Sequence, residues 1–529
     1  MRTWQLRAMG VIAGIVVGVF WSNPALGATV EYQGPGGDLD IPTNWYVITN
    51  PNEPATRTGE TRLPLKYSGT YPTGTPGDTA IVRNGTTTTV NGSLDAQYLS
   101  LGGPVITGQP TGSPTTVYVP SGSTVSMYSD DPFNPLRLNI GGPYPATLNV
   151  NGGNVNVFAR HGGGIYVGTS STGTGVMNLS SGIVRIEQAA ANASVLALGF
   201  HGGNGRINQS GGSMRVLNSP GTTTAFRLGA GGYGQVDLSN GWFQIDAVSR
   251  IGHEWTDPDA ILPDVPGTGL FTLTGGTFQY GYRIIVGDGN RGDANVGHLR
   301  FLGGTIQSDP AIDPSIGSHL WVGRGMNDTA TPGAIGKMTY NQAAKVNVWG
   351  LIMGRDGWDD TNSQMELKIN SYANFDTWYE DLLVLQGTLE VSLTDGFKPA
   401  LGSEWRIAQV SPTLPGPGFY VLNFPKITPG FRVEKRGYDV YLICDDLVHP
   451  GDANNDGAVD ESDLGILEGN WNQDTILGKA WEDGDFTGDD LVDVNDLEIL
   501  NANWGWRIPE PASLSLLLAG ALALIRRRR

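Results

Sequence analysis

A short acidic loop occurs twice near the C-terminal end of this 529-residue chain, in Gly451–Trp471 and again in Gly484–Trp504. Corresponding residues of the two copies are 33 positions apart, and this constant shift indicates a duplication. In each copy, oxygen-bearing side chains stand at loop positions 1, 3, 5, 9 and 12. These residues are Asp452, Asn454, Asp456, Asp460 and Asp463 in the first copy, and Asp485, Thr487, Asp489, Asp493 and Asp496 in the second.

This spacing is that of a loop that wraps a hard cation in six to eight oxygens. The carbonyls of Ala458 and Leu491, at position 7, are expected to be further ligands. Gly457, at position 6, permits the sharp turn that brings the loop ends together. Calcium is the predicted ion, because no soft ligand is present and magnesium prefers fewer protein oxygens. The second loop is predicted to be the weaker site, because Asp490 stands where glycine is expected and Thr487 replaces Asn or Asp.

A helical spacing of apolar residues follows each loop. Leu464, Leu467 and Trp471 stand at i, i+3 and i+7 after the first loop, and Leu497, Leu500 and Trp504 repeat the spacing after the second. Each unit is therefore predicted to be a loop with one exiting helix, and the two apolar faces are expected to pack together. The alternative is an acidic, solvated linker, but linkers do not repeat ligand and aromatic spacings together.

This tandem arrangement, from Asp446 to Trp506 within a module predicted over residues 445–508, resembles the type I dockerin family. The resemblance implies calcium-dependent docking to a cohesin-like protein. In dockerins of cellulase assemblies, loop positions 10 and 11 help to choose the cohesin. Here they are Glu461-Ser462 and Val494-Asn495, unlike the paired small or hydroxyl residues of that group.

Charge and composition restrict the remaining functions. The formal net charge is −18, yet residues 445–505 alone hold 17 acidic residues and one basic residue, Lys479. The rest is nearly balanced, which argues against a nucleic-acid partner. The 77 glycines and 32 prolines accompany a hydrophobic fraction of 39%, a combination that favours many short strands and tight turns. A single cysteine, Cys444, excludes an internal disulfide framework.

The fold is predicted to be mainly β, with a β-solenoid of about 30-residue coils over residues 94–380. Similar eleven-residue blocks begin at Thr147, Val176, Arg206, Gln235, Leu270, His298 and Met338, and a weaker copy begins at Leu367. Within a block, apolar and polar residues alternate on both sides of a small pair, which predicts a strand that turns a corner. Between blocks, strands that close on glycine recur from Gly102 to Gly354. Residues 28–93 and 381–444 are expected to be β caps. The region resembles the passenger-like β-solenoids of bacterial surface proteins.

Both ends of the chain carry export features. Residues 1–27 resemble a secretory signal, with Arg2 and Arg7, a short apolar core and a cleavage site at Gly27; an uncleaved anchor is the alternative. Residues 509–529 combine Pro509, Glu510 and Pro511 with a predicted hydrophobic helix and with Arg526, Arg527, Arg528 and Arg529. This segment resembles the PEP-CTERM sorting signal, which implies an exosortase-type processing enzyme and membrane anchoring before processing; a plain tail anchor is the alternative. The expected location is the cell surface or the extracellular matrix.

No catalytic residues are predicted. The most suggestive cluster lies in successive turns: Asp288, Arg291, Asp293, Arg324, Asp328, Arg355, Asp356, Asp359 and Asp360. Paired carboxylates there suit glycoside hydrolysis or a calcium site, whereas charged residues are also common in turns simply because turns are solvated. The favoured function is thus a non-catalytic surface protein with a polysaccharide as a candidate ligand. The rival is a polysaccharide hydrolase or lyase on a β-helix. Outward Asn149, Asn151, Asn154, Asn156, Asn178 and Ser180 favour the scaffold.

Overall fold

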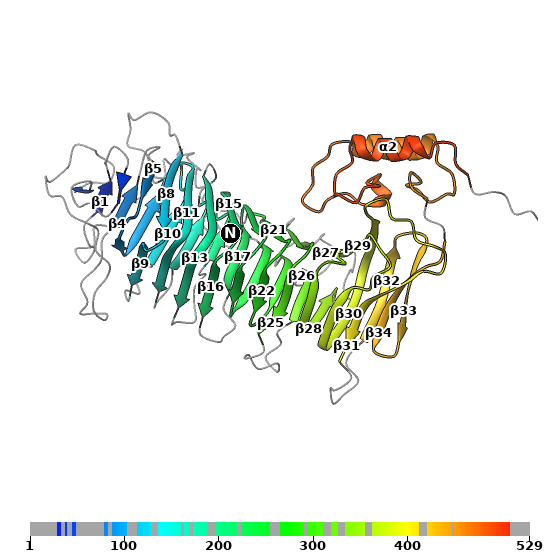
Figure 1. The fold of residues 1–529 in the computed structure, drawn as a ribbon, viewed down its shortest axis with the longest axis horizontal. Coiled ribbons are helices and arrows are strands. Elements are labelled where there is room, and N and C mark those ends of the chain that lie inside the picture. Colours follow the sequence, from blue (N-terminus) through cyan, green and yellow to red (C-terminus); the bar gives the residue numbers. More distant parts are fainter. Residues whose placement is uncertain are drawn as a thin grey trace, which may run out of the picture.

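A computed structural model describes residues 29–32, 37–39, 45–48, 79–82, 87–102, 114–129, 136–159, 163–169, 171, 173–188, 196–218, 224–253, 265–289, 295–309, 319–325, 334–354, 362–411, 420–446 and 449–507. The predicted signal peptide and sorting segment both lie outside these residues. The described chain is mainly β and contains a large parallel sheet of many strands, consistent with the predicted β-solenoid. Successive strands lie side by side along the long axis of the molecule (Figure 1).

Three parallel ladders make up the rod, and each coil contributes one strand to each ladder. The first ladder contains β4 (Thr79–Val82), β7 (Tyr98–Leu101), β10 (Leu136–Ile140), β12 (Gly163–Val167), β14 (Leu196–Leu198), β17 (Thr224–Ala230), β20 (Val248–His253), β23 (Ile284–Gly289) and β26 (His319–Gly325).

The second ladder contains β5 (Thr87–Thr89), β8 (Thr115–Pro120), the first halves of β11 (Ala146–Ala159) and β13 (Thr174–Gln188), then β15 (Asn204–Gln209), β18 (Tyr233–Leu238), β21 (Thr268–Leu273), β24 (Val296–Phe301), β27 (Ile335–Asn341) and β29 (Ser363–Ile369). The third contains β6 (Ser93–Ala96), β9 (Thr124–Ser129), the second halves of β11 and β13, β16 (Ser213–Asn218), β19 (Trp242–Ile245), β22 (Thr277–Tyr280), β25 (Thr305–Ser308) and the start of β28 (Lys345–Met353).

The predicted alternation sets which side chains face inward. In β11, Leu148, Val150, Val155 and Val157 are buried, while the intervening asparagines are partly or fully exposed. Further along the rod the interior becomes aromatic: the ring centroids of Phe243 and Phe271 lie 5.7 Å apart. Burial of this apolar column, roughly 25 cal/mol per Å², is the main force that stacks one coil on the next.

The corner glycines allow the coils to approach each other closely. Gly141, Gly168 and Gly199 end successive strands of the first ladder with φ of +74°, +68° and +66°. A Cβ on any of these residues would overlap backbone atoms of the second-ladder strand of the next coil, Thr174 for Gly141, Asn204 for Gly168 and Tyr233 for Gly199. The glycines that end these strands in the sequence therefore mark corners where the backbone is in the left-handed region, which glycine adopts readily.

The predicted register is correct for most blocks and wrong for the last two. Thr147 pairs with Val176 and Val176 with Arg206, as the repeat predicts. In the first half of the next block, however, His298 pairs with Lys337 and not with Met338. In the second half of that block Thr305 pairs with Lys345, 40 residues further along the chain, as predicted. The corner at residues 341–344 is one residue longer than the corner before it, so a single offset does not fit both strands. Met338 itself pairs with Met365, two residues before the predicted block at Leu367.

The C-terminal end of the rod changes direction. Parallel stacking continues through β30 (Asp376–Leu393) and β32 (Tyr420–Ile427), beyond residue 381 where the cap was expected to begin. Antiparallel pairing then joins β31 (Glu404–Val410), β33 (Phe431–Arg436) and β34 (Asp439–Cys444). At the other end, β1 (Thr29–Tyr32) pairs antiparallel with β3 (Trp45–Ile48), and β2 (Gly37–Asp38) pairs with β5.

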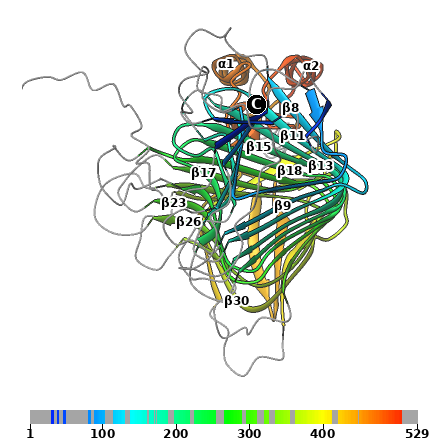
Figure 2. The same ribbon diagram turned by 90° about the vertical axis from the view of Figure 1, so that its left-hand side faces the viewer.

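The two helices follow the acidic loops, as predicted. They are α1 (Glu461–Asn470) and α2 (Val494–Ala502), and a 3-10 turn (Trp481–Asp483) lies between them. Both helices lie on one side of the rod, near its C-terminal end (Figures 1 and 2). Residues 451–507, with both loops and both helices, are called the acidic module below.

Candidate metal centre

The first acidic loop is closed by its own carboxylates. Asp452 is 1% exposed, and its carboxylate accepts hydrogen bonds from the backbone N–H groups of Asp456 (3.1 Å) and Gly457 (3.0 Å). Asp463 is fully buried and accepts from the N–H of Ala453 (2.8 Å) and of Asp460 (2.9 Å). Loop positions 1 and 12 thus tie the two ends of the loop together.

The second loop repeats this arrangement. Asp485 is fully buried and accepts from the N–H of Gly488 (2.7 Å) and of Asp490 (2.8 Å). Asp496, also fully buried, accepts from the N–H of Thr487 (2.9 Å) and of Asp493 (2.8 Å). The duplication therefore preserves local geometry as well as spacing.

Position 9 of each loop is also the N-cap of the helix that follows. Asp460 accepts from the N–H of Ser462 at 2.9 Å, and Asp493 accepts from the N–H of Asn495 at 2.7 Å. Each cap forms a capping box with the carboxylate three residues later. The same acids that suit a cation therefore also start the helix, since an N-cap carboxylate satisfies backbone donors that have no intrahelical partner.

The helices pack through their leucines and not through their tryptophans. Leu467 and Leu500 are fully buried, but Trp471 is 36% and Trp504 47% exposed. The expectation that each tryptophan continues the apolar helix face is wrong, because α1 ends at Asn470 and α2 at Ala502. The tryptophan that contacts both loops is Trp481: its indole N–H donates to the carbonyl of Asp452 at 2.9 Å, and its ring packs edge-on against Phe486 with ring centroids 5.2 Å apart.

Each loop buries several carboxylates close together, and this raises the pKa of some of them. Burial, together with the nearby Asp463 carboxylate, raises the pKa of Asp452 to about 6. Burial and then Asp496 raise the pKa of Asp485 to about 7, although Lys368 acts in the opposite direction. The raised pKa values mean that the charged form of each carboxylate is disfavoured, and a positive charge in the loop would favour it.

The donor set fits a hard cation, because it consists of carboxylates, an amide, a hydroxyl and backbone carbonyls. Within the part of the chain that the structure describes, no three His, Cys, Asp or Glu side chains are gathered closely enough to hold a metal ion. The predicted ligands of each loop do lie in one loop, but their oxygens accept backbone hydrogen bonds. Calcium would therefore have to recruit the position 3 and 5 side chains and the position 7 carbonyl.

Beneath the acidic module lies a charged strip of the second ladder that the sequence analysis did not identify. It comprises His298 and Arg300 on β24, Lys337 and Thr339 on β27, Glu366 and Lys368 on β29, and Glu390 and Ser392 on β30, which extends the ladder by pairing with β29. Lys337 is 2% exposed and pairs with Glu366 at 3.1 Å and with Glu390 at 2.8 Å. Burial would raise the pKa of Glu366, but Lys337 and Lys368 lower it to about 2. Burial raises the pKa of Glu390.

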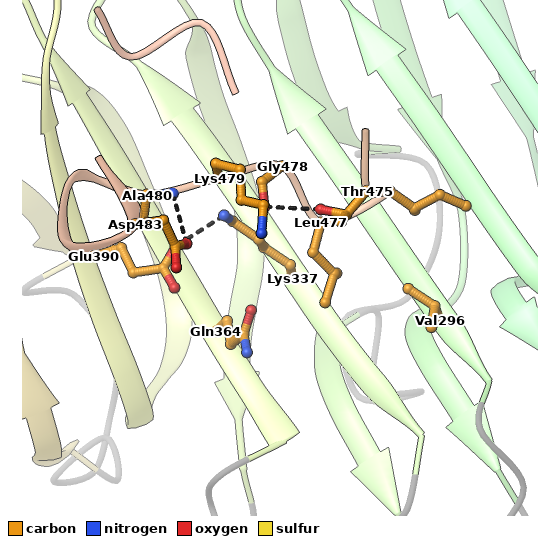
Figure 3. A pocket seen from close by; sticks show the side chains of 11 residues that line it. Val296, Lys337, Gln364, Glu390, Thr475, Leu477, Gly478, Lys479, Ala480 and Asp483 are labelled. Atoms are coloured by element: carbon orange, nitrogen blue, oxygen red, sulfur yellow. Dashed lines mark hydrogen bonds and ion pairs between the residues drawn. The ribbon is translucent and has the colours of Figure 1, made fainter. Parts of the chain in front are cut away.

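A cavity of about 460 Å³ separates part of the strip from the module (Figure 3). Its floor includes Lys337, Gln364 and Glu390, and residues 475–480 with Asp483 form its opposite wall. One signal for the strip was available in the sequence. In the second ladder, the outward positions of the blocks at Thr147 and Val176 are uncharged, Arg206 and Asp237 follow in the next two coils, and charged residues become frequent after residue 297.

The predicted cluster of charged turns is mostly outside the described residues. The side chain of Asp288 is described: it is 2% exposed and forms an ion pair with Arg250 at 3.0 Å. Arg291, Asp293, Asp328, Arg355, Asp356, Asp359 and Asp360 lie outside the described residues, and only the backbone of Arg324 is described.

Comparisons of this chain with protein-family models, with curated proteins and with solved structures gave no match. Among the residues with described positions, no helix has the length and apolar character needed to cross a membrane.

Proposed function

We propose that this chain is a non-catalytic exported protein of the cell surface or extracellular matrix. In this proposal a β-solenoid is displayed through a PEP-CTERM-type sorting segment, and a dockerin-like module binds a cohesin-like protein when calcium is present. The observation that carries the proposal is the pair of loops with matching carboxylate geometry, each ending in a capped helix. Exosortase-type processing and a transient membrane anchor at residues 509–529 follow from the sequence resemblance.

Calcium would be held by positions 1, 3, 5, 7 and 12 of each loop, with position 9 acting directly or through water. When bound, the ion would supply the positive charge that the buried carboxylates of Asp452 and Asp485 lack. Calcium binding would thereby order both helices, because loop and helix share the N-cap carboxylates.

Titration calorimetry on the chain from residue 29 onward tests this function. We expect two calcium ions to bind, and we expect Asp452→Ala combined with Asp485→Ala to abolish binding. Asp474→Ala is the matched control, since Asp474 is an exposed acid of the same module outside both loops. Retention of the helical circular dichroism signal in excess chelator, or binding by the double variant, would contradict the proposal.

A hydrolytic function has one observation in its favour. Glu366 and Glu390 contact the same ammonium group, and their pKa values are shifted in opposite directions, as in many acid–base pairs. Glu366 is nevertheless fully buried, and Lys337 lies between the two carboxylates. We therefore expect no oligosaccharide release from a polysaccharide panel. Release that Glu390→Gln abolishes would establish the rival.

A further inference from the structure

The second loop of the acidic module contacts strands of its own chain. The Lys368 ammonium on β29 donates to the Gly488 carbonyl at 2.7 Å and pairs with the Asp490 carboxylate at 2.8 Å. Arg300 on β24 pairs with the same carboxylate. Nearby, His298 Nδ1 donates to the carbonyl of Ile476 at 2.6 Å. These contacts join segments that are more than 100 residues apart in the sequence.

Asp490 is an unusual residue for its place in the loop. It stands at position 6, where the backbone needs a positive φ: the value is +75° for Asp490 and +84° for Gly457 in the first loop. A non-glycine residue is strained there, so something must compensate for it. The two cations that Asp490 meets supply this compensation, and the Asp490 side chain is only 11% exposed.

Gly488 provides a second sign that this loop is shaped to fit the rod. It is buried with φ of +70°, and a Cβ there would overlap the Thr394 methyl group just after β30. The corresponding residue of the first loop is Asn455, which carries a side chain at a φ of +52°. The second loop thus has a side chain where the first has glycine, and glycine where the first has a side chain.

The outward side chains of the second ladder differ between the early coils and the coils that the loop contacts. One outward position of the second ladder is Asn149, Asn178 and Asn208 in successive coils, and their amides form hydrogen bonds of 2.8 Å with each other. The same position is Asp237 and then Thr272 in the next two coils, and it is Arg300, Thr339 and Glu366 nearer the C-terminal end. The neutral amide ladder therefore ends at Asn208, and beneath the module two of the three residues at this position are charged.

We propose that the second loop–helix repeat is a built-in docking element whose partner is the charged strip of the same chain, and that Asp490 specifies this contact. The first repeat then remains free to bind an external partner; this part of the proposal rests on the proposed docking function. Position 3 is exposed in the first loop (Asn454) and partly buried in the second (Thr487), whereas position 5 is exposed in both (Asp456 and Asp489). On this basis Asp490 is a positioning residue for the module and not a defect in a calcium loop.

Hydrogen exchange of the full chain, measured by mass spectrometry with and without calcium, tests the proposal. Asp490→Gly restores the usual loop residue and removes both ion pairs. We expect it to accelerate exchange at least tenfold in residues 363–369 and 475–480, and to leave residues 146–188 unchanged. Lys368→Met should have a similar effect, and the double variant should add little to either change. Asp474→Gly is the matched control and should have no effect.

The proposal is overturned if Asp490→Gly leaves the protection of residues 363–369 and 475–480 unchanged. It is also overturned if the Asp490→Gly and Lys368→Met effects simply add. These outcomes are independent of calcium docking. A wild-type chain that binds no calcium but loosens with Asp490→Gly would contradict the proposed function alone. A chain that binds calcium and shows unchanged protection in the variant would contradict only the docking inference.

Discussion

At the scale of single residues, a buried histidine links the rod to the module. His298 is 1% exposed, and its ring contacts the Ile476 carbonyl on one side and the Thr339 hydroxyl, at 2.8 Å, on the other. Burial and the adjacent Lys337 lower the pKa of this imidazole from 6.5 to about 3, while Glu366 acts in the opposite direction. The folded protein therefore keeps the ring neutral where the unfolded chain protonates it.

His298 gives the first prediction, a loss of stability on acidification. Between pH 6.5 and about 3 the unfolded chain binds more protons at this site, so the free energy of unfolding falls as the pH is lowered through that window. At pH 5 the loss is about 2 kcal/mol relative to pH 7.5. The His298→Gln variant keeps a donor for the Ile476 carbonyl but cannot titrate. Urea denaturation should therefore show a difference in the free energy of unfolding between wild type and variant that becomes smaller as the pH is lowered. A gap of constant size would contradict the assignment.

The corner glycines give the second prediction. Gly229 has φ of +73°, and its Cβ would overlap the Thr268 carbonyl oxygen, so Gly229→Ala should cost about 2–4 kcal/mol in urea denaturation. Gly122 is the matched control: its φ is +84° but no atom lies within 4 Å of the added Cβ. Gly122→Ala should cost only about 1–2 kcal/mol. Equal costs would mean that close stacking does not require glycine at the corners.

At the scale of elements, the third prediction concerns the ion network that crosses β27, β29 and β30. Lys337→Met leaves Glu390 without its cation and Glu366 with only Lys368, at 3.7 Å. Loss of one partner from a buried ion pair costs about 3–5 kcal/mol. Adding Glu390→Gln should recover part of this loss, because a neutral amide needs no counter-ion. A Lys337→Met variant as stable as wild type would show that water reaches the carboxylates.

The elements that the sequence predicted correctly are those governed by local rules. The alternation around Leu148 and the acid at the N-cap of each helix depend only on nearby residues, and the strand and the helices form where these signals stand. The register of Lys337 was missed because it depends on the length of one corner. The charged strip was missed because its burial depends on a module whose contacts with it join residues 120 to 190 positions apart, and no local period carries that information.

At the scale of the whole molecule, the C-terminal end of the rod is stabilised both by its neighbouring coils and by the acidic module. Along the ladders each coil rests on its neighbours, so stability is close to a sum of repeat and nearest-neighbour terms. Beneath the acidic module, by contrast, the strands depend on a segment that is remote in the chain. The Lys426–Glu482 ion pair of 2.8 Å lies at the exposed margin of the interface between rod and module, so it should add little stability.

The fourth prediction follows from this difference and concerns a chain truncated after Asp445. Without the module, Lys337, Glu366 and Glu390 become a solvated network, and an exposed ion pair contributes only about 0–1 kcal/mol. The cost of Lys337→Met should therefore fall from about 3–5 kcal/mol in the longer chain to about 1 kcal/mol or less in the truncated one. Gly229→Ala acts far from the module, so its cost should be the same in both chains, which controls for a general loosening of the rod. Urea denaturation of the four variants and their two parents gives the comparison. If Lys337→Met costs as much in the truncated chain, the strands alone bury the network and the module merely lies over it.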